Sequence, residues 1–440
     1  MKKVLIISPH FPPVNAADMH RVRQTLPYLK DQDWEPTVLT VEPRYIEIVK
    51  DELLDKHIPK DIVIHKVKAF STSCTRQFGL GNLGIRAFYQ LYKKGCELLR
   101  NEKFDLIYFS TTVFSCLPLG RLWKHKFGVP FIIDMQDPWR NDYYLGVPKN
   151  LRPPKFTYAY HLDKWMESYT MPKVDGLVAV ASGYIDALKS RYPKLTDTPS
   201  RVLTLGAHPP DLDIASSINA EEMDYNLDPS KINIVYAGVV PKNMLFSIEA
   251  LMKALKKLIE SDKKFADVQL HFVGTNYATG GYLRSALDEL IEDYKLENNV
   301  TERPLRVPYF QALKLIQQCD LSILAGTTDK DYTASKLYPY IMTKKPMIAI
   351  FNECSSVVSI LKKIDYGAIQ TFNPKTDQNE LSDRLFKELK AFVNRKVGQQ
   401  ENANELFDDY MSEYLAKQQV DFFEEVLDHI AKKKRVVSGG

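Results

Sequence analysis

Residues 332–351 read YTASKLYPYIMTKKPMIAIF: a hydroxyl-bearing loop, an amphipathic segment that stops at Pro346, and an apolar run that reaches Phe351. This order predicts a loop, a helix and a buried strand. Ser335 is a candidate N-cap, because its hydroxyl can accept a hydrogen bond from a backbone N–H group of the first turn. Free N–H groups at a helix start, with Lys336 beside them, suit an anion such as a phosphate. An ordinary capped helix is the alternative.

Short apolar runs like the one that ends this stretch recur along the chain, with helical patterns between them. Non-alternating apolar strands separated by helices predict parallel sheets that are covered on both faces. We expect a first series of strands at 4–7, 36–41, 62–67, 106–110, 131–133, 176–180 and 202–205. A second series is expected at 232–236, 268–273, near 300, and at 321–324, 347–350 and 368–370. The most regular helical patterns cover 245–260 and 405–432.

The chain has 440 residues, which is too many for one ordinary core and predicts two domains. We expect an α/β protein with an N-terminal Rossmann-like domain at 1–205 and a C-terminal one at 206–404. The polar, proline-containing segment 206–223 is predicted to be the linker, and in 405–440 a helix is expected to cross back to the first domain before a basic tail. Ligands of such sheets bind at the carboxyl ends of the strands, so the two domains should face each other across a cleft.

Composition narrows the possible functions. The chain is 45% hydrophobic and 26% charged, as globular proteins are, and its net charge of +4 is too small to indicate a nucleic-acid partner. Its 5 cysteines are scattered, which favours reduced thiols in a cytoplasmic protein over a disulfide framework or a metal site. No run approaches the roughly 18 apolar residues of a membrane span. The basic stretch 76–100 could touch the inner membrane surface weakly, although packing of its apolar side on a sheet is the more common arrangement.

The loop after the first strand is rich in groups that bind hydroxyls or move protons. His10, Asp18 and His20 lie in the segment 8–29, just before or at the start of a helix that is expected near Ala17. The alternative is that His20 packs on the sheet.

Acidic and aromatic residues follow the expected strand at 131–133, in the sequence FIIDMQDPWRNDYY. Asp134, Asp137, Trp139 and Arg140 suit a carbohydrate, because carboxylates bind hydroxyls and aromatic rings cover C–H faces. A carboxylate desolvated against Trp139 would have a raised pKa, which is useful in a base. Capping of turns by the two aspartates is the alternative.

Two strands of the second series end in glycine. Gly238 follows the strand at 232–236 and precedes Lys242, while Gly274 and Thr275 follow the strand at 268–273. Glycine permits a close backbone approach, so two such turns at one cleft suit a nucleotide diphosphate.

The order of these motifs resembles glycosyltransferases of the GT-B group, family 4, which build bacterial surface polysaccharides. The resemblance covers nearly the whole chain, and its remaining motifs are DGLVAVASGYIDAL at 175–188, YAG at 236–238, FVG at 272–274, CDLSIL at 319–324 and SKLYPYIMTKKP at 335–346. It implies a nucleotide-sugar donor bound by the second domain and a glycan or lipid-linked acceptor bound by the first. It also implies that no cofactor and no metal are needed.

Residue by residue, the resemblance implies a donor site in the second domain. Its members are expected to be Gly238, Lys242, Gly274, Thr275, Arg306, Val307, Asp331, Thr333, Ser335 and Lys336. His10, Asp134, Trp139 and Arg140 are expected to contact the acceptor. Two departures from the family pattern stand out. Pro339 replaces the second of two paired acids, which usually binds the ribose, and Ala16-Ala17 replaces a double glycine in the first loop.

The expected reaction moves a sugar from a nucleoside diphosphate to a hydroxyl. Lys242, Lys336 and the adjacent helix start are expected to stabilise the charge that develops on the leaving diphosphate. Asp137, Asp18 or His20 would position or deprotonate the acceptor, and the resemblance implies retention of the anomeric configuration. A catalytically inactive GT-B subunit is an alternative because of Pro339. A GT-B sugar-nucleotide epimerase is another, although no clear acid and base pair is visible.

Overall fold

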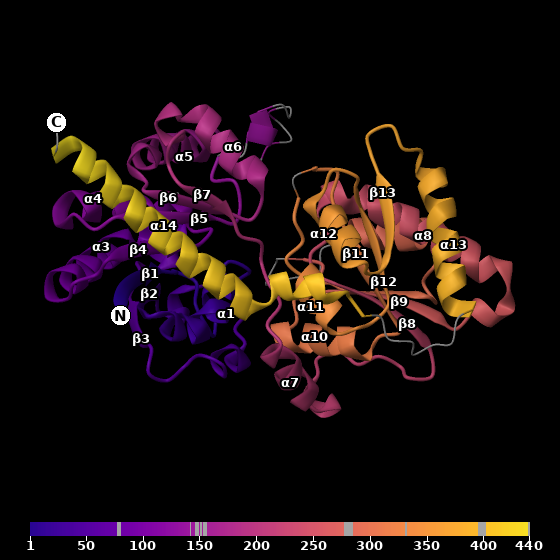
Figure 1. Ribbon diagram of the computed structural model, residues 1–440. Helices are drawn as coiled ribbons and strands as arrows, with labels where there is room; N and C mark the ends of the chain where they lie inside the picture. The colour runs from indigo at the N-terminus through magenta and orange to yellow at the C-terminus, as the bar shows by residue number, and fades with distance from the viewer. Residues whose placement is uncertain are drawn as a thin grey trace. The chain divides into compact units, whose positions relative to one another are not determined.

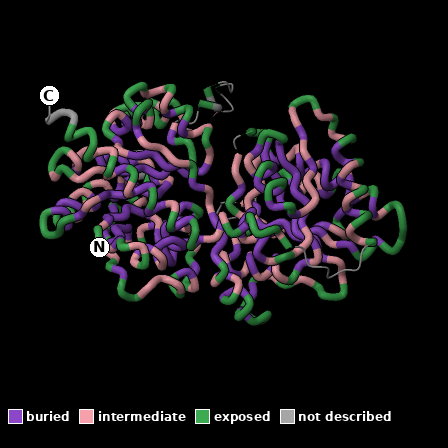
Figure 2. The backbone as a smooth tube through the Cα atoms, viewed as in Figure 1, coloured by how far each residue is buried: buried purple, intermediate pink, exposed green. Residues whose placement is uncertain are grey.

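The computed structural model describes residues 1–76, 81–140, 142–145, 149, 152, 156–276, 285–330, 332–394 and 402–438. The chain forms two compact units. Unit 1 consists of Met1–Leu205 together with Ser412–Gly440, and unit 2 consists of Gly206–Met411. Each unit is built on one sheet with helices around it (Figure 1). Buried residues follow the strands inside each unit, whereas exposed residues lie on loops and outer helix turns (Figure 2).

The sheet of unit 1 has seven parallel strands in the order β3-β2-β1-β4-β5-β6-β7. The strands are β1 Lys2–Ile7, β2 Trp34–Val41, β3 Val63–Val67, β4 Leu106–Ser110, β5 Phe131–Met135, β6 Gly176–Ala179 and β7 Ser200–Val202. The strand order reverses between β1 and β4. The loops after these two strands therefore lead in opposite directions, so a crevice is expected outside their carboxyl ends.

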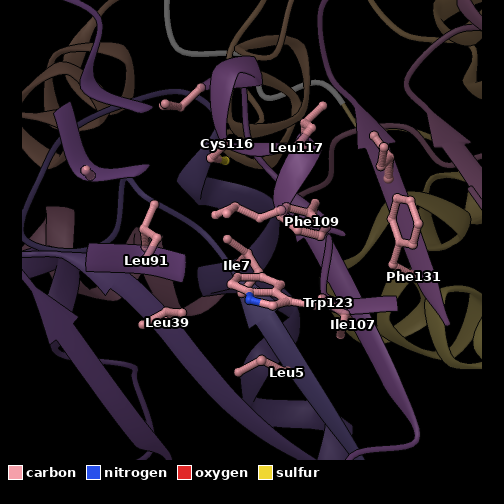
Figure 3. Close-up of a cluster of buried hydrophobic side chains, with 14 of the residues drawn as sticks. Leu5, Ile7, Leu39, Leu91, Ile107, Phe109, Cys116, Leu117, Trp123 and Phe131 are labelled. Atoms are coloured by element: carbon pink, nitrogen blue, oxygen red, sulfur yellow. The ribbon is translucent and has the colours of Figure 1, made fainter. Parts of the chain in front are cut away.

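Neighbouring residues of one strand in unit 1 enter two different cores, because side chains alternate between the faces of a sheet. Leu5 and Ile7 pack in the larger core, where Trp123 stacks on Phe109 with ring centroids 6.0 Å apart (Figure 3). The helices that supply the larger core are α3 Leu83–Asn101, α4 Pro118–Phe127, α5 Phe156–Thr170 and α6 Ser182–Arg191. The opposite face is covered by α1 Met19–Leu29 and α14 Ser412–Ser438.

The sheet of unit 2 has six parallel strands in the order β10-β9-β8-β11-β12-β13. They are β8 Ile232–Ala237, β9 Val268–Val273, β10 Val300–Arg303, β11 Leu321–Ala325, β12 Met347–Asn352 and β13 Ala368–Phe372. The helices are α7 Pro210–Ser217, α8 Leu245–Ser261, α9 Ala286–Tyr294, α10 Tyr309–Gln318, α11 Leu337–Met342, α12 Ser356–Ile364 and α13 Gln378–Asn394. Here the strand order reverses between β8 and β11, which is the second point where a crevice is expected.

All thirteen predicted strands are present, and the prediction of two Rossmann-like sheets is confirmed. The position of β7 is shifted toward the N-terminus, to Ser200–Val202. The last helix is α14, which begins at Ser412, and a 3-10 helix at Glu405–Tyr410 precedes it.

The expected linker at 206–223 is wrong, because most of it is folded within unit 2. Pro209 and Pro210 start helix α7, where a missing N–H group costs nothing. Asp211 of α7 is buried and accepts a hydrogen bond of 3.0 Å from Tyr309 Oη of α10. Lys314 of α10 donates to the carbonyl of Ser216 at 2.9 Å.

The basic stretch 76–100 largely forms α3, and its apolar side packs in the larger core of unit 1. Arg86 is buried and donates to the backbone carbonyls of Phe70 and Tyr45 at 2.8 and 2.9 Å. This residue therefore holds loops together and is not free to meet a membrane. No helix in the part of the chain that the structure describes combines the length and hydrophobicity of a membrane span.

Candidate functional site

Asp18 occupies the switch point of the sheet in unit 1. It lies at the start of α1, close to the loop that follows β4, and its side chain is buried. Its carboxylate accepts hydrogen bonds from Thr111 Oγ1 at 2.9 Å, from the backbone N–H of Thr112 at 2.9 Å and from Thr112 Oγ1 at 3.1 Å. The fold thus ties the loop after β1 to the loop after β4 through one carboxylate.

His10 is the fourth group that contacts Asp18. Its Nδ1 lies 2.9 Å from Oδ1 and 3.1 Å from Oδ2 of the carboxylate. Burial by itself would raise the pKa of Asp18, but the charge and hydrogen bond of His10 and the donors of Thr111 and Thr112 lower it to about 2. Asp18 is therefore ionised across the physiological range. The sequence placed both residues in one loop, and the structure brings their side chains together.

Asp134, at the end of β5, is fully buried and serves the interior of unit 1. Its Oδ2 lies 2.6 Å from Arg21 Nε and accepts a hydrogen bond of 2.8 Å from Ser110 Oγ. Arg21 in turn donates to the carbonyls of Leu203 and Thr204 at 2.7 and 3.0 Å. The expectation that Asp134 contacts an acceptor does not fit this position, because the carboxylate has no exposed surface and balances a buried arginine.

Trp139 is also internal, which contradicts its expected role as a platform for a sugar. Its side chain is buried, its ring stacks on Phe114 with centroids 5.9 Å apart, and its Nε1 donates to Asp163 at 3.3 Å. Arg140 forms an ion pair of 3.0 Å with Asp142 and lies over the ring of Tyr160. These contacts hold the loop after β5, which also contains an aspartate two residues before Trp139.

Asp137 is that aspartate, and it has an exposed side chain. Enough protein surrounds it to remove part of its hydration, which raises its pKa to about 6, and the negative charge of Asp18 acts in the same direction. Its electrostatic coupling to Asp18 joins it to the same polar site. His20 faces another way, since its Nδ1 lies 3.2 Å from Arg23 Nη2 on the following turn of α1.

Lys336 marks the switch point of the sheet in unit 2. Its Nζ donates to Tyr236 Oη at 3.0 Å and lies 4.2 Å from the centroid of that ring. A Cβ atom built on Gly238 would overlap Lys336 Nζ, and Gly238 has a φ of 141°, which side chains rarely tolerate. Gly238 therefore leaves the space that the Lys336 ammonium group occupies at the carboxyl end of β8.

A second cation acts on Lys336. Burial lowers the pKa of Lys336 to about 7, and the positive charge of Arg306 contributes to the decrease. Arg306 lies in the loop after β10, close to Gly274: a Cβ on Gly274 would lie 3.6 Å from Arg306 Cα. Val307, the next residue, is buried. Two cations near one strand end repel each other, so an anion bound there would be favourable for both.

Tyr340 closes the gap where β8 and β11 separate. The described ladder between these strands ends at Val235. Beyond it, Tyr340 Oη accepts from the N–H of Ala237 at 3.0 Å and donates to its carbonyl at 3.1 Å. The tyrosine therefore replaces a missing strand partner and holds α11, which carries Lys336 at its start, against the end of β8.

Ser335 is not the N-cap of this helix, contrary to the sequence interpretation. Helix α11 begins at Leu337, its N-cap is Lys336, and no side chain caps it. The helix has only six residues, so its N-terminus offers little to an anion compared with the charge of Lys336. Pro339 lies within α11.

The other expected donor residues surround this position or lie outside it. Thr275 is buried and donates its hydroxyl to Glu302, while Thr333 shares a hydrogen bond of 3.0 Å with Ser356. Lys242 is exposed at the start of a 3-10 helix, Lys242–Met244. Asp331 lies outside the described residues.

Sequence reasoning missed four residues that build the two polar centres: Thr111, Thr112, Tyr236 and Tyr340. The threonines directly follow the strand at 106–110, so inspection of that strand end would have found them. The tyrosines lie in the motifs YAG and SKLYPYIMTKKP, but their roles could not be read there, because Tyr236 pairs with Lys336 and Tyr340 pairs with Ala237, each about 100 positions away in the sequence.

Comparison with solved structures identifies the architecture. The chain is similar to a glycosyltransferase from Rickettsia africae ESF-5, with 16% identity, a TM-score of 0.58 and coverage of 97% of this chain and 99% of that chain. It is similar to Anabaena Alr3699/HepE in complex with UDP-glucose, with 12% identity, a TM-score of 0.58 and coverage of 98% and 100%. It is also similar to a Listeria monocytogenes protein provisionally described as a UDP-N-acetylglucosamine 2-epimerase, with 13% identity, a TM-score of 0.50 and coverage of 96% of this chain and 95% of that chain.

No protein-family model matches the sequence, and no curated protein matches it in sequence. At identities this low, the structural similarity establishes the fold: two parallel α/β sheets in the GT-B architecture.

Proposed function

We propose that this chain is a glycosyltransferase that moves a sugar from a nucleoside-diphosphate-sugar to a hydroxyl of a glycan or lipid-linked acceptor, as in surface polysaccharide synthesis. The observation that carries the proposal is the position of the Lys336 ammonium group beside Gly238, at the point in unit 2 where the strand order reverses. A structure with the same fold contains UDP-glucose, which is consistent with a donor of this class.

Lys336 and Arg306 give unit 2 the chemistry that a leaving diphosphate needs. Their charges repel each other in the absence of a ligand. A diphosphate between them would remove this repulsion, and the gain grows as negative charge develops on the leaving group. Transfer would then depend on these two side chains for charge stabilisation, and we propose that it needs no metal ion. Exposed Lys242 would add a third cation to the same loop region.

Unit 1 would bind the acceptor at its own switch point. Asp18, His10 and Asp137 form a polar centre there, and Asp137 is the exposed member. A hydroxyl-bearing acceptor suits such a centre because a carboxylate can accept its hydrogen bond. We place the reaction in the cytoplasm, with contact to the membrane surface where the acceptor carries a lipid.

Pro339 favours a second candidate, a GT-B subunit that binds nucleotide without turnover. Proline has no side-chain acceptor for a ribose hydroxyl, so the usual carboxylate contact is lost within α11. An epimerase is the third candidate, since one structure of this fold carries that description. The three candidates predict different products. A transferase releases the nucleotide and moves the sugar, an inactive subunit changes neither, and an epimerase changes the sugar while it stays attached to the nucleotide.

The test is titration calorimetry with a panel of UDP, GDP and dTDP sugars, followed by an assay for nucleotide release with glycan and lipid-linked acceptors. We expect binding and acceptor-dependent release, and Lys336→Ala should weaken donor affinity roughly 10- to 100-fold, because a charged hydrogen bond is worth about 1.5–3 kcal/mol. Lys375→Ala, at an exposed lysine before α13, is the matched control and should bind normally.

Results other than binding with acceptor-dependent nucleotide release would support a different function. Binding without release would indicate the inactive subunit, and conversion of the sugar without release would indicate an epimerase. If no nucleotide sugar binds, or if Lys336→Ala binds as well as the wild type, the donor site is not where we place it.

A further inference from the structure

We propose that unit 1 binds the surface of an anionic membrane through a groove where the C-terminal ends of α3, α4 and α14 meet. The groove has a volume of about 620 Å³, and these helix ends lie together at one end of unit 1 (Figure 1). Its apolar wall includes Phe127, Leu427 and Ile430, and its basic rim consists of Arg100, Lys103 and Lys434. The inference goes beyond the proposed transferase function, because binding to a membrane needs neither donor nor acceptor.

This basic groove lies at the amino-terminal edge of the sheet in unit 1. Lys103 and Phe104 come just before β4, and Val129 and Pro130 come just before β5. The polar centre around Asp18 lies at the other edge, and the five residues of β4 separate the two edges by about 17 Å. A membrane bound at the basic groove would therefore leave the polar centre of unit 1 open.

The apolar wall of the basic groove comes from both cores of unit 1. Phe127 and Val129 are half-buried against the larger core, while Leu427 and Ile430 are half-buried against the core on the opposite face of the sheet. Ala431, beside them on α14, is exposed. Apolar side chains that remain partly exposed together are typical of a surface that binds a partner.

The cations of the rim have no partner within the part of the protein that the structure describes. Arg100, Lys103 and Lys434 are exposed, and their side chains form no hydrogen bond or ion pair with a described residue. Arg100 is also the last residue of the basic stretch 76–100, so one end of that stretch is free to meet a membrane although Arg86 is not. An unpaired cation on an apolar rim suits a bound anion.

The two acids in the basic groove do not cancel this charge, because both are engaged by Lys3. Glu102 forms an ion pair of 3.2 Å with Lys3 Nζ, and Asp105 accepts a hydrogen bond of 2.8 Å from the backbone N–H of Lys3. On α14, Asp421 and Asp428 line a different groove, on another side of the helix. The surface that surrounds the apolar wall is therefore positive on one side of α14 only, which would orient unit 1 on an anionic surface.

Positive charge is also concentrated on the helices that end at the basic groove. Helix α3 has four lysines and arginines and one glutamate, and α4 has three with no acid, although the net charge of the whole chain is only +4. A cation in the last turn stabilises a helix by itself. That effect does not require an apolar groove between the cations. Basic side chains around an apolar surface are what an anionic bilayer binds, since lipid phosphates pair with the cations and the interface receives the apolar groups.

The first test is sedimentation of the full chain with lipid vesicles. Phosphatidylcholine vesicles that contain about 30% phosphatidylglycerol should bind it, pure phosphatidylcholine vesicles should not, and binding should weaken in high salt. Arg100→Gln, Lys103→Gln and Lys434→Gln together should weaken the affinity about 100-fold, because each basic residue near an anionic surface contributes roughly a factor of five. A wild type that does not bind the anionic vesicles would overturn the proposal.

The control for the rim has the same net charge as the rim variant. It combines Lys362→Gln, Lys375→Gln and Lys387→Gln, at exposed lysines of unit 2, and should keep the wild-type affinity for vesicles. Thermal melting establishes that both variants are folded. Equal losses of affinity in the two variants would show attraction by net charge alone, and the basic groove would not be the binding surface.

The second test adds an apolar group to the wall. Ala431→Trp should tighten vesicle binding severalfold and shift the tryptophan emission to shorter wavelength on binding, because tryptophan prefers the membrane interface. Ala391→Trp, at an exposed position of α13 in unit 2, is the control and should do neither. If Ala431→Trp behaves like this control, the wall does not reach the bilayer and the proposal fails.

Two further measurements separate a membrane from other partners. Binding to polyglutamate but not to the anionic vesicles would indicate an acidic protein partner and would overturn the proposal. Size-exclusion chromatography that shows a wild-type dimer, absent from the rim variant, would assign the basic groove to a second copy of the chain instead. None of these measurements contains donor or acceptor, so a failure here leaves the transferase proposal unchanged.

Discussion

At the scale of single residues, Lys336 lies beside Gly238 at the end of β8 and has a lowered pKa. Burial and the charge of Arg306 bring its pKa to about 7, so near neutral pH the free protein carries it in both protonation states. A bound diphosphate would favour the charged state and raise this pKa again. Binding of a nucleotide-sugar donor would therefore be linked to uptake of a proton at Lys336.

Proton uptake on donor binding is the first prediction. At about pH 8, binding of a UDP-sugar should take up close to one proton, whereas at about pH 6 it should take up almost none, because Lys336 is then already charged. Affinity should correspondingly fall as the pH rises above 7. A UDP-sugar is the suitable ligand because its diphosphate diester does not titrate in this range. Calorimetry in two buffers of different ionisation enthalpy measures the uptake.

Lys336→Arg is the control for this prediction, since a guanidinium stays protonated at every pH used. The variant should bind with no proton uptake near pH 8. Uptake of a full proton by Lys336→Arg would assign the linkage to another group.

Several of the predicted donor residues lie close together in the structure, but not always for the predicted reason, and their role in binding stays a prediction. Lys336 and Gly238 were predicted to bind a donor phosphate, and the structure places them in contact. The predicted cause, a helix capped by Ser335, is wrong. Asp134 was misassigned because its partner Arg21 is distant in sequence, and no local pattern shows that a carboxylate will balance a buried arginine.

At the scale of elements, strands were predictable and short helices were not. A strand buried on both faces appears as a run of apolar residues, which loops rarely produce, so the central strands were predicted well. The partly exposed strand β7 at a sheet edge was predicted at 202–205, two residues too far along the chain. Prolines and acids are common both in linkers and in the first turn of a helix, so α7 was taken for a linker. The packing of α7 on α10 through Asp211 and Tyr309 is a tertiary contact that composition does not reveal.

Helix α14 gives the prediction at this scale. Phe423 is fully buried against the sheet of unit 1, with its ring 5.2 Å from Trp34 and 5.1 Å from Tyr108, both edge-on. Phe423→Ala should lower the free energy of unfolding by about 3–5 kcal/mol, the usual cost of removing a buried phenylalanine. Urea denaturation followed by tryptophan fluorescence measures it, because Trp34 reports on this contact.

Tyr414→Ala is the matched control, since Tyr414 lies on the same helix and is 41% exposed. It should change the free energy of unfolding by no more than about 0.5 kcal/mol. Equal effects of the two substitutions would mean that α14 does not cover the sheet as described.

At the scale of the whole molecule, unit 1 is built from both ends of the chain and unit 2 from its middle. Helix α14 completes the core that Val4, Ile6 and Trp34 begin, and Arg201 Nη2 forms an ion pair of 2.7 Å with Glu425. The segment that forms unit 2 starts and finishes at neighbouring points, because the N–H of Ala207 donates to the carbonyl of Tyr410 at 2.8 Å. The sequence predicted the return of the last helix, since no strand follows it, but it contained no signal for the order of the strands.

This organisation predicts what each fragment will do. A fragment of residues 1–205 lacks α14, so the apolar face of its sheet is exposed and it should aggregate. The same fragment with residues 412–440 joined to Leu205 through a short Gly/Ser linker should be monomeric and folded, because the meeting of Ala207 and Tyr410 brings the two junctions close together. Residues 206–411 alone should fold and bind a UDP-sugar, since Lys336, Gly238 and Arg306 all belong to unit 2. Size-exclusion chromatography, circular dichroism and calorimetry measure these outcomes. A soluble, folded 1–205 fragment would show that α14 is not needed to cover the sheet of unit 1. A folded 206–411 fragment that does not bind the donor of the full chain would show that the donor site needs residues outside unit 2.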